Sequence, residues 1–252
     1  MVPLAVLINL SLLLNIFTNT GHQPVIDPMA DPSSRSIGRL IGKLSECTAT
    51  LVDAEIILTA AHCIIGHEHE GLYFETGSLK QGEGEKRQLD LTTKIVGTES
   101  FYDHPHDDYA LVKLTTPMPP SFIPLEIRSL KDTDALKRDI KIYLTAYTSG
   151  PWIYGQEGKP VTEMCSPRMY YTGGKEFTHD CSTIDGYSGA PLYIKTDVSK
   201  IVIGIHTGMV HGEPVPVPFS LRLANHAVDG EKLKAALDSL RVLIHSERAK
   251  SR

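Results

Sequence analysis

The feature that most constrains the fold is a succession of short apolar segments separated by turns. These segments are rich in Val, Ile, Thr and Tyr, and Gly and Pro recur between them. No helical period of any length runs through them, which favours β-strands. The candidate strands are 37–44, 48–52, 56–59, 72–75, 91–96, 109–114, 140–146, 169–172, 192–195, 201–206 and 219–223. We therefore expect an all-β chain arranged as barrels or a sandwich.

The last segment has a different period. From Asp229 onward, apolar residues at positions 233, 237, 240 and 244 recur at helical spacing with charged residues between them. Asp229 is a suitable N-cap. We expect residues 229–252 to form a C-terminal helix and tail, with the apolar stripe packed on the second half of the chain. The alternative for this stripe is a partner-binding face.

The first twenty residues are interpreted as a secretory signal peptide. Residues 4–17 are almost continuously apolar, but they are too few and too interrupted to span a membrane. The positive n-region of a signal peptide is missing, and an N-terminal core helix is the alternative. Residues 21–36 are rich in Pro, Asp and Ser and are expected to form an N-terminal arm or propeptide. The mature chain is predicted to be secreted, with no membrane attachment once the signal is removed.

Size and charge exclude some functions. The chain has 252 residues, 41% of them hydrophobic, which suffices for a substantial core. Its net charge is −5 and it has no long basic run, so nothing indicates a nucleic-acid partner.

Four cysteines fall in two pairs of equal spacing. Cys47 and Cys63 are 16 residues apart, as are Cys165 and Cys181. In an exported chain an even number of cysteines indicates disulfides, and we predict Cys47–Cys63 and Cys165–Cys181. Four cysteines allow three connectivities, between which the sequence does not strictly choose. A zinc site is the alternative, but its C-x-x-C spacing is absent.

One stretch has the composition that a nucleophile needs. Residues 181–192 read C-S-T-I-D-G-Y-S-G-A-P-L, so glycines flank Ser188 on both sides. Glycine permits unusual backbone dihedrals and lets a substrate carbonyl approach the main chain. The N–H groups of Gly186 and Ser188 are then candidates for an oxyanion hole. Many ordinary turns contain G-x-S-G, so this motif alone does not identify an enzyme.

Two further segments supply a base and an acid. A serine hydroxyl needs a base, usually histidine, and that histidine needs an acid to orient it. His62 lies in L-T-A-A-H-C, directly before a cysteine with apolar residues behind it. Asp107 and Asp108 precede the apolar strand Y-A-L-V-K-L, so an acid lies at the strand's solvated end.

The three segments T-A-A-H-C, D-x-A-L-x-K-L and G-x-S-G-x-P-L, in this order, resemble chymotrypsin-like serine proteases over roughly residues 37–223. The resemblance implies His62 as general base, Asp108 as orienting acid and Ser188 as nucleophile, with Asp107 as the competing acid. It also implies two six-stranded antiparallel barrels, here 37–125 and 126–228, with the active site between them.

Departures from the trypsin pattern point to one branch of the clan. Tyr187 replaces the aspartate before the serine, so the amine–aspartate switch of zymogen activation is missing. Ser182 aligns with the acid of a trypsin pocket, so nothing supports cleavage after Lys or Arg. Thr183, five residues before Ser188, and His206 in G-I-H-T-G resemble glutamyl endopeptidases. Ser182, Thr183 and His206 are therefore the predicted substrate pocket.

These observations predict a secreted, monomeric serine endopeptidase that cleaves protein or peptide substrates after Glu or Asp, without a cofactor. The alternatives are another specificity, or a catalytically silent homologue that binds a partner. The motifs His67-Glu68-His69 and His104-Pro105-His106 suggest metal sites, but no complete ligand set accompanies them, so we interpret both as solvated loops and predict no metal site.

Overall fold

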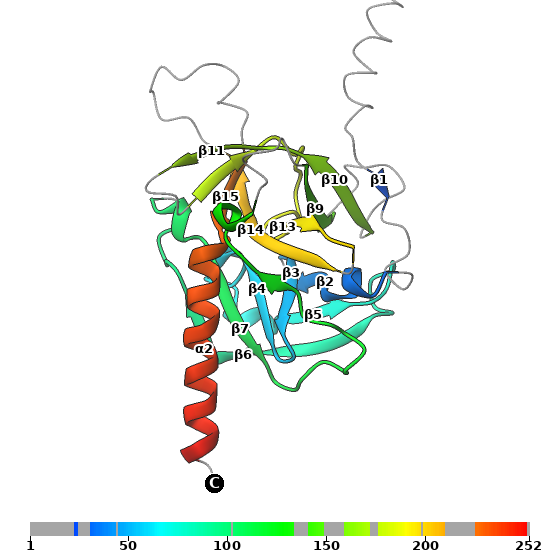
Figure 1. The fold of residues 1–252 in the computed structure, drawn as a ribbon. Coiled ribbons are helices and arrows are strands. Elements are labelled where there is room, and N and C mark those ends of the chain that lie inside the picture. Colours follow the sequence, from blue (N-terminus) through cyan, green and yellow to red (C-terminus); the bar gives the residue numbers. More distant parts are fainter. Residues whose placement is uncertain are drawn as a thin grey trace, which may run out of the picture.

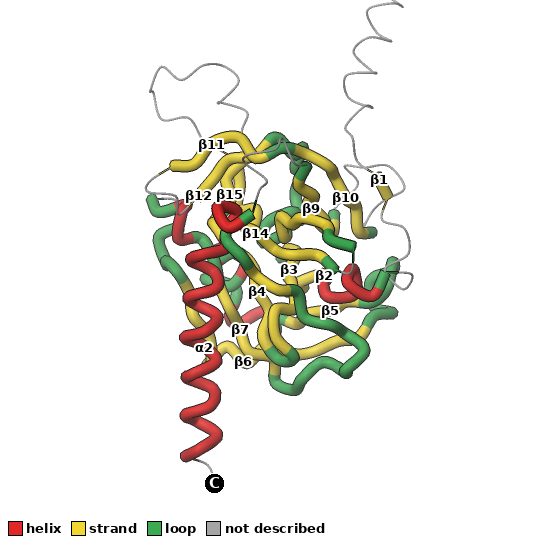
Figure 2. The backbone as a smooth tube through the Cα atoms, viewed as in Figure 1, coloured by secondary structure: helices red, strands yellow, loops and turns green. Residues whose placement is uncertain are grey.

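The structure is a computed structural model that describes residues 23–24, 31–43, 45–101, 103–133, 141–148, 159–171, 176–197, 199–209 and 225–250. It has two β-rich halves and one long C-terminal helix, which runs along both halves (Figures 1 and 2). The predicted signal peptide, the candidate strand 219–223 and half of the predicted N-terminal arm, residues 21–22 and 25–30, lie outside the described residues.

The first half is a closed antiparallel barrel in the order β2-β3-β4-β7-β6-β5, called here the first barrel. Its strands overlap the six predicted between residues 37 and 114. Their bounds are β2 Ile37–Ile41, β3 Glu46–Asp53, β4 Ile56–Thr59, β5 Tyr73–Thr76, β6 Glu85–Val96 and β7 Ala110–Leu114. Apolar side chains fill its interior, including Leu40, Ala49, Ile57, Phe74 and Val112. The prediction of a six-stranded barrel is confirmed for this half.

The second half, called here the second sheet, has the strand order β1-β10-β9-β13-β14-β15-β12-β11, with β8 paired parallel to β14. It curls as a half-barrel (Figure 1). The bounds are β1 Gln23–Pro24, β8 Glu126–Ile127, β9 Ile142–Tyr147, β10 Pro160–Cys165, β11 Pro167–Tyr171, β12 Glu176–His179, β13 Pro191–Lys195, β14 Lys200–Met209 and β15 Asn225–Asp229.

The second sheet is not the closed six-stranded barrel that was expected. Within the described residues, β12 is flanked by β15 and β11, so no edge of β12 is left to pair with β10. Because β11 begins just after β10 ends, it occupies that edge itself. The ends of β10 and β12 are instead joined by one backbone hydrogen bond, from Asp180 N–H to Ser166 O at 3.2 Å, and by the Cys165–Cys181 disulfide.

Besides the two-residue strands β1 and β8, three longer strands of the second sheet were not predicted from the sequence. β10, β12 and β15 each bury polar side chains, namely Glu163, Glu176 with His179, and Asn225. A strand that buries polar groups does not display the apolar run by which strands are recognised. Both predicted disulfides, Cys47–Cys63 and Cys165–Cys181, are present.

The C-terminal helix α2 spans Gly230–Lys250. Asp229 caps it as predicted, because its carboxylate accepts the N–H of Glu231 at 2.9 Å. The buried face comprises Leu233, Ala236, Leu237, Leu240 and Ile244. These side chains join a core that lies between the halves, with Leu58 and Leu111 from the first barrel and Val202 and Val228 from the second sheet. The helix packs on the second half as expected and also contacts β6 and β7 of the first barrel, so it bridges both halves.

The described residues include five short 3₁₀ helices: η1 Pro32–Ser36, η2 Ala61–Cys63, η3 Glu68–Glu70, η4 Pro105–Asp107 and η5 Leu130–Asp132. In the part of the chain that the structure describes, no helix has the length and apolar character needed to cross a membrane.

Candidate active site

His62 and Asp108 meet at one edge of the first barrel. His62 lies in η2, just after β4, and Asp108 lies just before β7. Since β4 and β7 pair antiparallel with Thr59 opposite Ala110, the end of one strand adjoins the start of the other. His62 Nδ1 lies 2.7 Å from Asp108 Oδ2, and the His62 backbone N–H donates to Asp108 Oδ1 at 3.0 Å.

This contact fixes the histidine tautomer. A carboxylate only accepts hydrogen bonds, so Nδ1 carries the proton and Nε2 is left as an acceptor. The Asp108 side chain is 6% exposed and that of His62 is 25% exposed. The acid is therefore shielded while the imidazole remains accessible. Phe101 packs against the ring of His62 at 5.7 Å between centroids.

The competing acid, Asp107, is turned to other partners. Its carboxylate pairs with Lys232 of α2 and lies 3.2 Å from His106 Nε2. Asp108 rather than Asp107 contacts His62, as the sequence motif predicts.

Ser188 lies in a turn between two glycines with left-handed backbone. Gly186 has φ +94° and Gly189 has φ +77°, values that other residues rarely adopt. A Cβ on Gly189 would clash with the Thr59 hydroxyl and the Thr48 carbonyl of the first barrel. The turn thus approaches β3 and β4 closely, and β4 ends at Thr59, three residues before His62. Within the described contacts, no hydrogen bond joins Ser188 Oγ to His62, and such bonds are often long in unliganded sites.

Thr48 of β3 holds the serine turn in place. Its backbone N–H donates to Ser188 O at 2.9 Å, and its hydroxyl donates to Gly186 O at 2.9 Å. The same hydroxyl accepts the N–H of Tyr147 from β9 at 3.0 Å. Thr48 follows Cys47, whose disulfide partner Cys63 follows His62. Nothing in the sequence distinguishes Thr48 beyond its place beside that cysteine.

His206 is fully built into the second sheet next to the serine turn. Its backbone exchanges hydrogen bonds with this segment, because Gly189 N–H donates to His206 O and His206 N–H donates to Ala190 O, both at 2.8 Å. Its Nδ1 lies 3.2 Å from Nε2 of His179. Burial, then the charges of His179 and His62, hold the pKa of His206 well below its usual value. Burial likewise lowers the pKa of His179 to about 3.

Thr183 is tied to Asn225 rather than left as a free donor. The Asn225 amide donates to Cys181 O at 2.6 Å, which orients its Oδ1 toward the Thr183 hydroxyl at 2.9 Å. Because Oδ1 only accepts, the hydroxyl hydrogen of Thr183 is directed at Asn225. Thr183 therefore presents an acceptor rather than a donor to a substrate in this arrangement.

Ser182 is exposed, and its N–H donates to the buried carboxyl of Glu163 at 2.8 Å. Burial raises the pKa of Glu163 to about 7. Tyr187, the residue before Ser188, is 1% exposed. Burial raises its pKa, and the charge of the Glu163 carboxyl raises it further. The residues that sequence reasoning missed here, Glu163, His179 and Asn225, all come from the three unrecognised strands.

The two H-x-H motifs lie in partly exposed loops with local partners. His67 Nδ1 lies 2.6 Å from Glu70 Oε1, and the rings of His104 and His106 pack edge to face at 5.8 Å. Neither motif belongs to the groups of potential metal ligands found among the described residues. Each of those groups contains both cysteines of a disulfide, whose sulfurs are not thiolates.

Comparison with known proteins agrees with this geometry. A model of the trypsin family matches residues 28–218. The chain belongs to the trypsin family. It is accordingly a serine protease of that family, and its substrates are proteins or peptides. A sequence comparison with curated proteins finds no match. A solved structure of a Glu endopeptidase in complex with MPD is similar in fold, with a TM-score of 0.64 and 15% identity over 84% of this chain and 92% of that chain.

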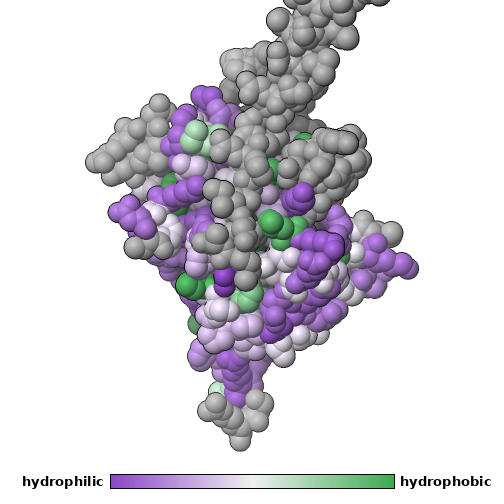
Figure 3. Space-filling model, turned by 90° about the vertical axis from the view of Figure 1, so that its right-hand side faces the viewer, coloured by the Kyte–Doolittle hydropathy of each residue, from purple (hydrophilic) through white to green (hydrophobic). Residues whose placement is uncertain are grey.

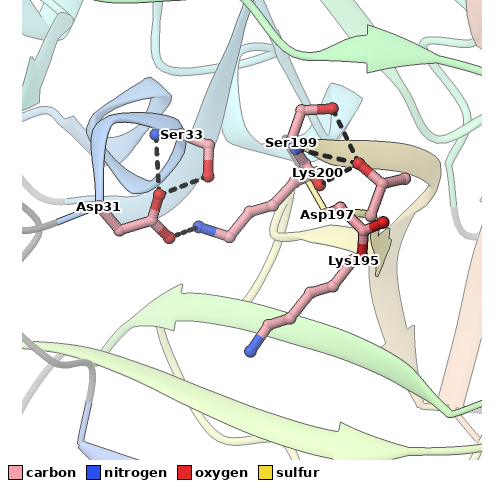
Figure 4. Close-up of a pocket in the computed structure, with 7 residues that line it drawn as sticks. Asp31, Ser33, Lys195, Asp197, Ser199 and Lys200 are labelled. Atoms are coloured by element: carbon pink, nitrogen blue, oxygen red, sulfur yellow. Dashed lines mark hydrogen bonds and ion pairs between the residues drawn. The ribbon is translucent and has the colours of Figure 1, made fainter.

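The N-terminal arm of this chain contacts the second sheet. Asp31 caps η1 and pairs with the buried Lys200 of β14 at 2.6 Å (Figure 4). Lys200 also contacts the Ser34 hydroxyl. A 240 Å³ hollow there is lined by this pair and by the β13–β14 turn, and none of its residues is a predicted site residue. The Lys200 and Ser33 contacts outweigh burial and lower the pKa of Asp31. The arm is thus anchored on the second sheet at Lys200, whereas Tyr187 stands buried where the family's activating aspartate would be.

Proposed function

We propose that this chain is an endopeptidase in which His62 is the general base, Asp108 its orienting acid and Ser188 the nucleophile. The observation that carries the proposal is the pair of hydrogen bonds from His62 to Asp108, at the barrel edge on which Thr48 holds the Ser188 turn. The contact with Asp108 leaves His62 Nε2 free to accept the serine proton.

The reaction would proceed through an acyl-enzyme. Ser188 Oγ attacks the substrate carbonyl carbon while His62 Nε2 takes its proton, and the N–H groups of Gly186 and Ser188 stabilise the oxyanion. His62 then protonates the leaving amine as the peptide bond breaks. A water molecule, deprotonated by His62, releases the acyl group and restores Ser188.

The proposed specificity is for glutamate, with aspartate second, on the acyl side of the cleaved bond. A buried carboxylate is costly unless it is paired and hydrogen-bonded. If His179 Nε2–H donates to His206 Nδ1, then His206 Nε2–H is a donor for that carboxylate, and the incoming negative charge favours protonation of His206. Thr183 does not donate to the carboxylate in this arrangement but holds Asn225 beside the proposed pocket, and Ser182 introduces no repelling charge.

Two experiments test these proposals in turn. A fluorescent organophosphonate should label wild-type protein at Ser188, while Ser188→Ala and His62→Ala proteins with intact disulfides should stay unlabelled. A folded wild-type chain that resists labelling would mean a catalytically silent homologue. A peptide library should then show cleavage after Glu, and after Asp more slowly. Preferred cleavage after Phe, Leu, Lys or Arg would contradict the specificity but keep the peptidase.

We further propose that the chain is secreted after removal of residues 1–20 and that activation needs no amine–aspartate pair. The two disulfides favour an oxidising compartment. Ile37 is fully buried in β2 and its carbonyl accepts the Tyr147 hydroxyl, so it is unsuited to be a free terminus. Sequencing of the active form should place its N-terminus between about residue 21 and Val25, as expected if the signal peptide and the start of the arm are removed. A fully active form that begins at Ile37 would contradict this proposal.

A monomer is the proposed state of the mature chain. Exposed large hydrophobic side chains among the described residues are scattered over distant parts of the sequence: Leu79, Ile123, Met164, Val242 and Leu243. On the face drawn in Figure 3 the described hydrophobic residues form small separate patches among hydrophilic ones. Light scattering at micromolar concentration should give the mass of one chain, and a dimer mass would contradict this proposal.

A further inference from the structure

Lys232 of α2 reaches from the second half of the molecule to the loop that carries Asp108. Its Nζ donates to His106 O at 3.0 Å and pairs with the Asp107 carboxylate. The same ammonium lies 5.9 Å from the centroid of the Tyr109 ring. One side chain thus approaches the two residues before Asp108 and the residue after it.

The position of this lysine is unfavourable for the helix itself. Lys232 lies in the first turn of α2, where the positive end of the helix dipole repels a cation. Asp229 and Glu231, by contrast, follow the usual preference for acids at a helix start. The side chain is also only 20% exposed, so its conformational freedom is restricted. What offsets these costs is the contact with η4.

The backbone of η4 transmits that contact to Asp108. Asp108 N–H donates to Pro105 O at 3.3 Å, and Tyr109 N–H donates to Asp107 O at 2.8 Å. On the other side the loop is packed so tightly that a Cβ on Gly97 would clash with the Asp107 carbonyl. Both carboxylate oxygens of Asp108 are engaged by His62, so a shift of the loop changes two hydrogen bonds at once.

We propose that Lys232 is a positioning residue that holds Asp108 against His62 by tying α2 to η4. The proposal rests on the proposed peptidase function and deepens it. Because α2 follows β15 directly, and β15 pairs with the β14 strand that carries His206, the contact of Lys232 with η4 also connects the second sheet to the loop of the first barrel that carries Asp108. Lys232 does not touch His62, Asp108 or Ser188 and takes no part in proton transfer.

The test compares three variants of the full chain. Lys232→Met removes the ammonium, Lys232→Arg retains a cation, and Arg241→Met is a matched control. Arg241 lies on the same helix and pairs at 2.7 Å with Asp53 of the first barrel, well away from η4 in the sequence. Lys232→Met should lower kcat by about 10- to 100-fold, with KM within about twofold of wild type, because misplaced catalytic groups affect the chemical step. Lys232→Arg should recover most of kcat, and Arg241→Met should retain it.

A second readout does not depend on activity. In Ser188→Ala protein, the downfield NMR signal of the His62 Nδ1 proton should shift or broaden with Lys232→Met and stay unchanged with Arg241→Met. A kcat loss equal in both variants, a rise of KM alone, or an unaltered His62 signal would each overturn the proposal. If the wild type neither cleaves nor labels, the proposed function fails, and the NMR comparison still decides whether Lys232 positions the pair.

Discussion

The two halves of the molecule bury charge in different ways. The first barrel buries Arg39 of β2 and Glu75 of β5 as a pair of opposite sign, 3.9 Å apart, on the outer face of these strands, where the Arg39 guanidinium lies over the Tyr147 ring of β9. The second sheet buries His179 and His206 against each other, and this burial lowers the pKa of both. The charge of His226 lowers the pKa of His179 further, and the charges of His179 and His62 lower that of His206 further. Paired charges are compensated at any pH near neutrality, whereas clustered histidines are stable only when neutral.

The difference matches what each half contributes to the site. The proposed acid–base pair, His62 and Asp108, must keep one geometry, and both residues adjoin strands of the closed first barrel. The proposed pocket must accept a charge that is absent before substrate arrives, and it is built from uncharged groups able to respond to that charge. We expect pH and substrate charge to act mainly on the second sheet, and the following predictions test this contrast.

The largest effect should come from breaking the proposed triad, which spans both halves. His62→Ala and Ser188→Ala should each lower kcat by at least about 10³-fold, because the residues act as a unit. The double variant should lose little more than either single variant. Steady-state kinetics with one peptide substrate decide this. Losses that multiply in the double variant would mean that the two halves contribute independently.

Removing His206 should separate recognition from chemistry. His206→Ala should lower kcat/KM for a glutamyl peptide by about 10²-fold, because the substrate carboxylate loses its donor. Hydrolysis of a small neutral ester, which does not use the pocket, should change far less. Thr183→Val should act in the same direction but more weakly, since Thr183 is directed at Asn225. Equal losses on both substrates would assign His206 to the catalytic machinery instead.

The two disulfides provide a matched comparison of the halves, because each closes a loop of the same sequence separation, 16 residues. Replacing either pair by serine should cost about 3 kcal/mol of unfolding free energy, as the chain-entropy model gives for such loops. Loss of Cys47–Cys63 should also lower kcat, because Cys63 adjoins His62. Loss of Cys165–Cys181 should raise KM for glutamyl peptides, because Cys181 begins the segment with Ser182 and Thr183. Urea unfolding and kinetics on both variants check this, and identical kinetic effects would contradict it.

The smallest effect concerns the pH dependence of stability. Below pH 6.5 an unfolded chain protonates His179, whereas the folded chain holds its pKa at about 3, so stability should fall as the pH drops from 6.5 toward 3. Glu163 acts in the opposite sense. Its folded pKa of about 7 exceeds the unfolded value of 4.5, so its contribution is lost as the pH rises between them.

Glu163→Gln isolates the second of these effects, because the amide oxygen still accepts the Ser182 N–H but does not ionise. Relative to wild type, this variant should gain about 1–3 kcal/mol of unfolding free energy between pH 5 and pH 8. The surface variant Glu85→Gln on the first barrel serves as the control and should show no such gain. Urea unfolding at three pH values provides the measurement. An equal gain in both variants would remove the contrast between the halves.

The local parts of this protein were readable from its sequence. The strands of the first barrel and the cap of α2 depend on patterns within a few residues. Both disulfides were predicted from the spacing of the cysteines, and the contact of Asp108 rather than Asp107 with His62 from the resemblance to a family motif. Such patterns report dihedral preference, periodicity and spacing, which a single segment determines by itself.

The tertiary structure alone decided which distant segments share an interface. Thr48 meets Gly186 and Ser188, and Lys232 meets His106 and Asp107, across more than a hundred residues of sequence. The open second sheet likewise follows from which strand occupies the edge of β12. These contacts form because packing of the two halves and of α2 brings particular faces together. A threonine or lysine has the same local character wherever it lies, so no local pattern distinguishes the one that a remote segment will reach.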